Sequence, residues 1–152
     1  MLDIGNKAPN FKLPNKDGNT ISLKDFKGKN VIVYFYPKDL TPGCTKQAIS
    51  FTEYSEEFAK RETVIIGISP DSSASHEKFT KKHNLNLILL ADEEKQAIES
   101  YGVWKEKKMY GRTFMGVERS TFLVDSTGTV QAIWRKVKVA KHIKEILEEL
   151  DK

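Results

Sequence analysis

One cysteine carries the most distinctive chemistry in this sequence. Cys44 is the single cysteine of the 152-residue chain, and Thr41, Pro42 and Gly43 stand directly before it. Threonine is a common helix N-cap and proline is favoured at the first helical position, so this order predicts that Cys44 lies in the first turn of a helix. Unpaired backbone N–H groups and the helix dipole favour a negative charge there, and therefore the reactive thiolate.

The alternative is that Cys44 has only a structural role. A lone cysteine is most often a small buried hydrophobe, and composition alone favours that interpretation. A structural cysteine does not require Thr-Pro-Gly before it, however, and Gly43 leaves the approach to the sulfur free of a side chain. The local sequence therefore favours a reactive cysteine.

We expect an apolar strand to lie directly before the segment that carries this cysteine. Residues 31–36 form a β-branched and aromatic run typical of a buried strand, and Pro37 ends it because proline has no N–H for strand pairing. Apolar residues recur at helical spacing after Cys44, and residues 64–69 form a second buried run. These segments predict a parallel βαβ unit with the cysteine at the start of its helix.

The rest of the chain alternates between strand and helix patterns. We expect a short hairpin over residues 11–23, a helix ending near His83, a strand over 86–90, a helix capped by Asp92 and ending at Gly102, a hairpin made by 120–125 and 129–134, and a final helix over 140–150. Residues 103–117 lack clear periodicity, and their aromatic and methionine side chains predict an ordered loop.

This order of elements indicates an α/β protein with a thioredoxin-like fold. We expect a mixed, mostly parallel central sheet covered by helices, an added N-terminal hairpin, and a single domain over residues 1–152. The N-terminus lacks a signal-peptide pattern and no apolar run approaches a membrane span, so we expect a cytoplasmic protein without a membrane partner.

The charge pattern does not favour a nucleic-acid partner. The net charge is +4, and the densest basic segment, residues 135–144, runs from a predicted strand into a predicted helix, so its charges point several ways. We interpret it as solvated surface. The histidines, His76, His83 and His142, have no nucleophile or carboxylate at a meaningful spacing, and we expect all three at the surface with no metal site.

The motif residues resemble those of peroxiredoxins. The signature Pro-x-x-x-Thr-x-x-Cys is present as Pro37, Thr41 and Cys44, and residues 36–48 resemble the bacterioferritin comigratory protein branch, also called peroxiredoxin Q. Further matches, in the family's order, make the resemblance cover nearly the whole chain. They are residues 67–71, 101–104 and 118–125.

This resemblance implies an antioxidant thiol peroxidase, acting on hydrogen peroxide and organic hydroperoxides without a metal or organic cofactor. Cys44 would be the peroxidatic cysteine and become a sulfenic acid. Thr41 would present its hydroxyl to the sulfur and the peroxide, and Pro37 would shield the sulfur from water. Arg119, by spacing alone a surface or ion-paired residue, would stabilise the thiolate and the leaving oxygen, assisted by backbone N–H groups at Gly43 and Cys44.

The sequence departs from this branch at two positions. Many members have a resolving cysteine five residues after the peroxidatic one, where this chain has Ile49, so an external thiol must reduce the sulfenic acid. The candidates are thioredoxin, glutaredoxin, a small thiol, or Cys44 of a second chain. Gln47 replaces a common glutamate and brings no charge to a network with Arg119. We expect a monomer, with a dimer through residues 103–117 as the alternative.

Two other functions remain open at this stage. Because the chain lacks a resolving cysteine, it is also compatible with a redox sensor or relay that passes the oxidation of Cys44 to a partner protein. A thioredoxin-fold binding or holdase module would instead contain an inert, buried Cys44. The reactivity of the thiol separates these functions.

Overall fold

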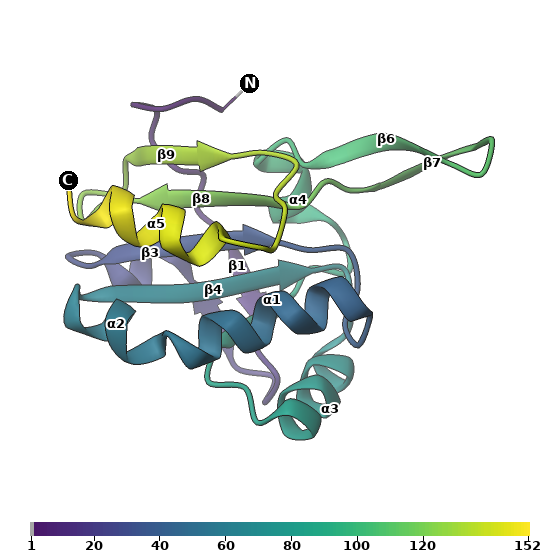
Figure 1. The fold of residues 1–152 in the computed structure, drawn as a ribbon, viewed down its shortest axis with the longest axis horizontal. Helices are drawn as coiled ribbons and strands as arrows, with labels where there is room; N and C mark the ends of the chain where they lie inside the picture. Colours follow the sequence, from purple (N-terminus) through teal and green to yellow (C-terminus); the bar gives the residue numbers. More distant parts are fainter. Residues whose placement is uncertain (1) are drawn as a thin grey trace.

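The computed structural model describes residues 2–152 and centres on a five-stranded mixed sheet (Figure 1). The strand order is β5-β4-β3-β8-β9. Parallel pairing joins β3 to β4 and β4 to β5, and β8 runs antiparallel between β3 and β9, so that all strands except β8 run in one direction. The strand bounds are β3 Asn30–Phe35, β4 Thr63–Ser69, β5 Ile88–Ala91, β8 Ser120–Val124 and β9 Val130–Trp134.

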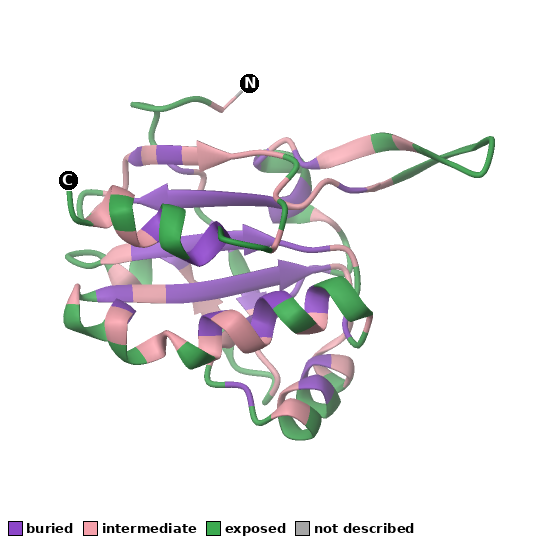
Figure 2. Ribbon diagram, viewed as in Figure 1, coloured by how far each residue is buried: buried purple, intermediate pink, exposed green. Residues whose placement is uncertain are grey.

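Helices cover both faces of this sheet. Side chains of β3 alternate between the faces, with Ile32 and Tyr34 on one and Val31 and Val33 on the other, and all are buried (Figure 2). One face packs against α1, α2, α3 and α5, and the other against α4 and the N-terminal segment. The helix bounds are α1 Pro42–Glu53, α2 Ser55–Lys60, α3 Ser73–His83, α4 Gln96–Ser100 and α5 His142–Leu150.

These elements confirm the thioredoxin-like α/β fold expected from the sequence. The predicted N-terminal hairpin is present as β1 (Lys12–Pro14) and β2 (Thr20–Ser22), followed by the single 3₁₀ turn η1 (Leu23–Phe26). The helix after Cys44 is divided at Tyr54 into α1 and α2, which the periodicity did not indicate.

The N-cap residue of α4 is Lys95 and not Asp92 as predicted, because the helix starts later than expected, but the Asp92 carboxylate still binds the first N–H groups of the helix. Its Oδ1 accepts from the backbone N–H of Gln96 at 2.7 Å and its Oδ2 accepts from that of Ile98 at 2.8 Å. A turn occupies the residues between Asp92 and the helix. Burial raises the pKa of Asp92, although these backbone donors act in the opposite direction.

The prediction of an ordered loop over residues 103–117 was wrong. The segment forms a β-hairpin of β6 (Trp104–Met109) and β7 (Arg112–Val117) that projects from the sheet (Figure 1). Tyr110 and Gly111 both have positive φ, the conformation of a two-residue turn whose twist matches that of antiparallel strands. The apolar side chains near the tip are exposed: Met109, Tyr110, Phe114 and Met115. The expectation that they would be covered does not hold in this chain.

The prediction that all three histidines lie at the surface was also wrong. His76 and His142 are buried, and each has a polar partner that compensates its desolvation. Only His83 is partly exposed, with its ring edge-on to Phe79. Separately, no helix among residues 2–152 combines the length and apolarity needed to cross a lipid bilayer.

Candidate active site

Cys44 lies in the first turn of α1, as the sequence predicts. β3 ends just before Pro37, and the chain reaches α1 through a short loop in which Thr41 is the N-cap and Pro42 the first helical residue. The first backbone hydrogen bond of the helix runs from the N–H of Thr45 to the carbonyl of Thr41 at 2.9 Å. The N–H groups of the two residues before Thr45 therefore precede the helical ladder and remain available to a ligand.

Arg119 comes from the segment between β7 and β8 and meets this cysteine across the fold. Its Nη2 donates to Cys44 Sγ at 3.3 Å, although the two residues are 75 positions apart in sequence. Its Nη1 donates to Oε1 of the buried Gln47 at 2.5 Å. Spacing alone suggested a surface residue at position 119; the structure instead places its guanidinium against the sulfur and holds it there through Gln47. A guanidinium stabilises a neighbouring anion such as a thiolate.

Gly43 provides the space that this guanidinium occupies. A Cβ atom at position 43 would lie 3.2 Å from Arg119 Nη2, which is closer than ordinary packing allows. The sequence suggested that Gly43 keeps the approach to the sulfur open. In the structure, the missing side chain also allows the arginine to reach Cys44.

Thr41 and Pro37 frame the site without contacting the sulfur through hydrogen bonds. Thr41 Oγ1 donates to the carbonyl of Lys38 at 2.8 Å instead of capping α1, which leaves its lone pairs free to accept a hydrogen bond. Pro37 is half-buried at the end of β3. Among residues 2–152, Arg119 is the hydrogen-bond partner of the Cys44 side chain, and Thr41 is not.

The pKa values of two further side chains respond to the charge on Cys44. Burial strongly raises the pKa of Tyr34, and a negative charge on Cys44 raises it further, so Tyr34 remains neutral. Burial lowers the pKa of Lys107 on β6, and the charge of Arg119 lowers it further, whereas Cys44 and Glu118 act in the opposite direction. Nothing in the sequence pattern indicated that Lys107 would belong to this electrostatic environment.

The position of the missing resolving cysteine is half-buried at the edge of a groove. Ile49 lines a groove of about 570 Å³ on the outer side of α1, together with Leu40, Pro42 and residues of α3. Cys44, at 2% exposure, points instead into the core between α1 and the sheet.

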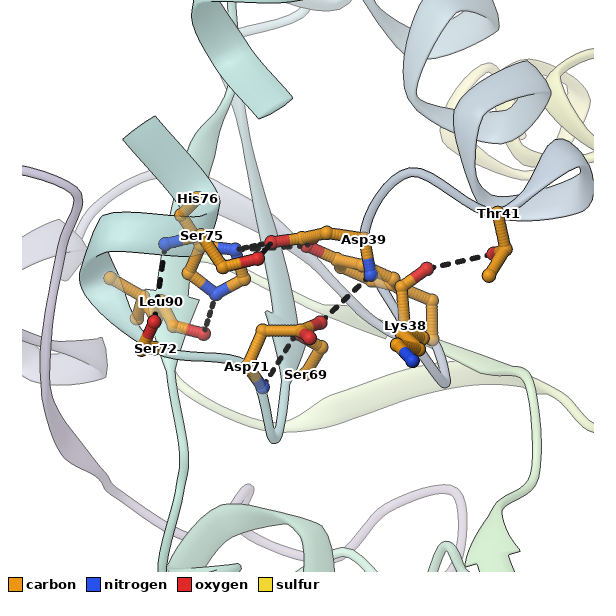
Figure 3. A network of polar contacts seen from close by, with 10 residues as sticks. Lys38, Asp39, Thr41, Ser69, Asp71, Ser72, Ser75, His76 and Leu90 are labelled. Carbon is orange, nitrogen blue, oxygen red and sulfur yellow. Dashed lines mark hydrogen bonds and ion pairs between the residues drawn. The ribbon is translucent and has the colours of Figure 1, made fainter. Parts of the chain in front are cut away.

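A second polar cluster, which the sequence did not reveal, lies beneath the loop that leads to Cys44. It centres on Asp39 and His76 (Figure 3). No group of three or more His, Cys, Asp or Glu side chains in the described part of the chain is arranged to hold a metal ion.

The arrangement has the parts needed for an attack by sulfur. It combines a thiol with a positively charged neighbour and a helix N-terminus whose free N–H groups stabilise negative charge. These features match a nucleophilic thiolate that displaces an oxyanion leaving group.

Comparisons with known proteins agree with this chemistry. The family model for the AhpC/TSA family matches residues 4–133. A peroxiredoxin Bcp of Bacillus subtilis (strain 168) is 50% identical over 149 residues, which cover 98% of this chain and 95% of the relative. The peroxiredoxin Bcp of Escherichia coli (strain K12) is 41% identical over 141 residues, covering 93% and 90% of the two chains.

Solved structures extend the similarity to the fold. The bacterioferritin comigratory protein of Xanthomonas campestris, described for its alkyl peroxide reduction activity, has a TM-score of 0.90 and 37% identity, covering 99% of this chain and 96% of its own. A peroxiredoxin Q mutant of Xylella fastidiosa has a TM-score of 0.94 and 32% identity, with coverage of 99% and 96%.

Proposed function

The chain belongs to the AhpC/TSA family and is a peroxiredoxin of the Bcp type, and from this premise we propose that it is a thiol-dependent peroxidase whose peroxidatic residue is Cys44. Its substrates are hydrogen peroxide and organic hydroperoxides. The observation that carries the proposal is the contact of Arg119 Nη2 with Cys44 Sγ at 3.3 Å, because it places a positive charge and a hydrogen-bond donor at the sulfur that attacks the peroxide.

The oxidative step transfers one oxygen atom to the sulfur. The Cys44 thiolate attacks the nearer peroxide oxygen, an S–O bond forms, and the O–O bond breaks. The leaving oxygen takes the electron pair as hydroxide or alkoxide and is protonated to water or an alcohol. Sulfur is oxidised by two electrons to the sulfenic acid, and the peroxide is reduced by two electrons.

Each neighbouring group has a part in this step. Arg119 stabilises first the thiolate and then the charge that develops on the leaving oxygen, with the free N–H groups of Gly43 and Cys44 as further donors. The Thr41 hydroxyl accepts a hydrogen bond from the bound peroxide while donating to Lys38. Pro37 limits the access of water to the sulfur.

The reductive half of the cycle needs a thiol from outside the chain, since Cys44 is the only cysteine. A thiol of the reductant loses its proton and attacks the sulfenic sulfur as a thiolate. The S–O bond breaks, the leaving hydroxide takes up a proton to become water, and a mixed disulfide forms. A second thiol of the reductant then attacks the mixed disulfide. Cys44 leaves as a thiolate, and the reductant is released as a disulfide. We propose thioredoxin or another cytoplasmic thiol as the donor, and a monomeric enzyme.

Stopped-flow oxidation of the reduced protein by hydrogen peroxide, followed by intact mass, tests the proposal. We expect rapid oxidation and a mass increase of one oxygen on Cys44, and no peroxide consumption by Cys44→Ser. The substitution Arg112→Ala, on the exposed hairpin, is a suitable control for nonspecific effects. A rate no faster than that of an ordinary free thiol, or sustained turnover by Cys44→Ser, would rule the function out.

The absence of a resolving cysteine also supports a redox relay as a second candidate. In that case the oxidised Cys44 forms a disulfide with one specific protein and does not turn over with general thiols. Turnover assays with thioredoxin, glutaredoxin and a small thiol separate the two: catalytic cycling with any of them favours the peroxidase. Stoichiometric capture of one partner without cycling favours the relay.

A further inference from the structure

Asp39, in the loop between β3 and α1, is a buried carboxylate held by three side chains. Its Oδ1 accepts from the Tyr36 hydroxyl at 2.6 Å, and its Oδ2 accepts from Ser75 Oγ at 2.8 Å (Figure 3). The same Oδ2 lies 2.7 Å from Nδ1 of His76. Burial strongly raises the pKa of Tyr36, so its hydroxyl keeps the proton that it donates. Both oxygen atoms of this carboxylate therefore have hydrogen-bond partners.

His76 has a defined orientation because both of its ring nitrogens have partners. Nε2 lies 2.9 Å from the carbonyl of Leu90, and a carbonyl only accepts, so Nε2 carries a hydrogen. Nδ1 faces the carboxylate of Asp39, so one proton lies between these two atoms, whichever of them holds it. With the two side chains 0% and 1% exposed, the pair is a single hydrogen-bonded unit shielded from water.

The backbone of Asp39 is fixed as well as its side chain. Its N–H donates to Oδ2 of Asp71 at 2.8 Å, and the same oxygen accepts from Ser69 Oγ at 2.7 Å. The ends of β3 and β4 and the first turn of α3 thus meet at Asp39, and β5 is linked to it through His76.

The residue after this anchor has a backbone conformation that needs support. Leu40 has a φ of 64°, in the left-handed region that non-glycine residues rarely adopt. Such residues persist only where their surroundings determine the conformation. Asp39 fixes the chain on one side, and the start of α1 at Thr41 fixes it on the other. The anchor therefore sets where α1 begins, and Cys44 lies one turn later.

We propose that Asp39 and His76 are positioning residues for the peroxidase reaction: they hold the loop so that α1 presents Cys44 Sγ to Arg119 and the peroxide. Neither contacts the sulfur by a hydrogen bond among the described residues. Buried pairs of this kind give little net stability compared with apolar residues of similar size, so their place beneath the reactive loop supports a geometric role. This inference rests on the proposed function.

A matched pair of histidine substitutions tests it. His76→Gln and His142→Gln each remove a buried imidazole, but His142 hydrogen-bonds Thr121 on β8 and not the loop. We expect His76→Gln to lower the rate constant of Cys44 with hydrogen peroxide by about 10- to 100-fold, the scale of an approximately 1 Å misplacement. Alkylation of Cys44 by iodoacetamide should stay constant or become faster, because the loosened loop exposes the thiol. His142→Gln should change neither rate.

Substitutions at Asp39 separate geometry from charge. An asparagine at position 39 donates to Nδ1 of a neutral His76 and still accepts from Tyr36. Asp39→Asn should therefore keep the peroxide rate within about threefold of the wild type. Asp39→Ala removes both hydrogen bonds and should lower the peroxide rate as much as His76→Gln does. If His76→Gln does not fold, Ser75→Ala removes one donor to Asp39 and should lower the peroxide rate by a smaller factor without slowing alkylation.

Several results would overturn the proposal. A peroxide rate in His76→Gln equal to that in His142→Gln would leave only a structural role. If His76→Gln lost reactivity towards peroxide and iodoacetamide to the same extent, the substitution would have removed the thiolate itself and would not have displaced it from Arg119. If Asp39→Asn reacted with peroxide as slowly as Asp39→Ala, the negative charge of Asp39 and not its hydrogen-bond geometry would be what the reaction needs. A wild-type protein that reacts slowly with peroxide would instead reject the proposed function on which the inference rests.

Discussion

The loop and first turn that carry Cys44 and the β6–β7 hairpin lie at the same end of the sheet, but they differ in how their side chains are held (Figure 1). In the first region, Cys44 and Gln47 are buried, and Arg119 reaches them through hydrogen bonds. In the hairpin, only the root packs against the core, through Trp104 and Val117. The tip exposes its aromatic side chains to water.

The comparison shows that residue type alone does not set a residue's role. An arginine, a phenylalanine and a glycine lie in or near each region, and their burial and their hydrogen-bond partners differ between the two. Replacing residues of the same type by alanine near each region therefore tests the contrast directly.

The largest contrast is expected between two phenylalanines. Phe51 of α1 is fully buried, with its ring stacked 4.6 Å from that of Tyr34, whereas Phe114 of β7 is 43% exposed. Phe51→Ala should lower the free energy of unfolding by about 3–5 kcal/mol through the cavity it leaves. Phe114→Ala should change it by about 0.5 kcal/mol or less. Urea unfolding measures both, and equal losses would show that the hairpin is covered by a partner in solution.

The next contrast is between two arginines. Arg119→Ala removes the donor to Cys44 Sγ and should lower the rate constant with peroxide by about 10²- to 10³-fold, as removal of one oxyanion donor does. Arg112→Ala, at the exposed end of β7, should leave that rate unchanged. Stopped-flow oxidation by hydrogen peroxide checks both variants. A comparable loss in Arg112→Ala would mean that the hairpin takes part in the reaction.

A smaller difference in the peroxide rate is expected between substitutions of two glycines. A Cβ at position 43 would lie 3.2 Å from Nη2 of Arg119, and one at position 116 would lie 3.3 Å from Cδ of Lys107. The lysine stem is flexible and can move aside, but the guanidinium cannot move without leaving the sulfur. We expect Gly43→Ala to lower the peroxide rate by about tenfold, equivalent to about 1.4 kcal/mol, and Gly116→Ala to have no effect. Wild-type kinetics in Gly43→Ala would contradict this assignment of Gly43.

The smallest effect concerns pH, and the comparison is between histidines because the hairpin has none. Burial lowers the pKa of His142 from 6.5, whereas Glu145 acts in the opposite direction. The unfolded chain therefore binds a proton at a higher pH than the folded chain, and stability rises with pH in the window just below about 6.5. The wild type should lose on the order of 1 kcal/mol more than His142→Gln between pH 7.5 and 5.

Urea unfolding across this pH range measures the difference. His83→Gln is the control, because His83 is partly exposed at the end of α3 and its replacement should leave the wild-type profile in place. Identical pH profiles for the wild type and His142→Gln would contradict the effect of burial on His142.

Local patterns in the sequence predicted most of the central fold. The apolar runs before Pro37 and at residues 64–69, the capping order before Cys44, and the hairpin after Ser120 depend on neighbours in the chain, which the sequence displays directly. Motif resemblance added the family and named Arg119. The hairpin of residues 103–117 was missed because its turn has tyrosine, not asparagine or aspartate, before Gly111, and because its exposed apolar residues suggested a covered loop.

Local sequence patterns specified most of the elements and the place of the cysteine at a helix start, because strand periodicity, caps and turns are set by residues a few positions apart. Only the tertiary structure brought Arg119 to Cys44 across 75 residues and His76 to Asp39 across 37. The same packing buried His76 and His142, which looked like surface residues. These contacts depend on how helices and strands pack together, and no local pattern carries that information.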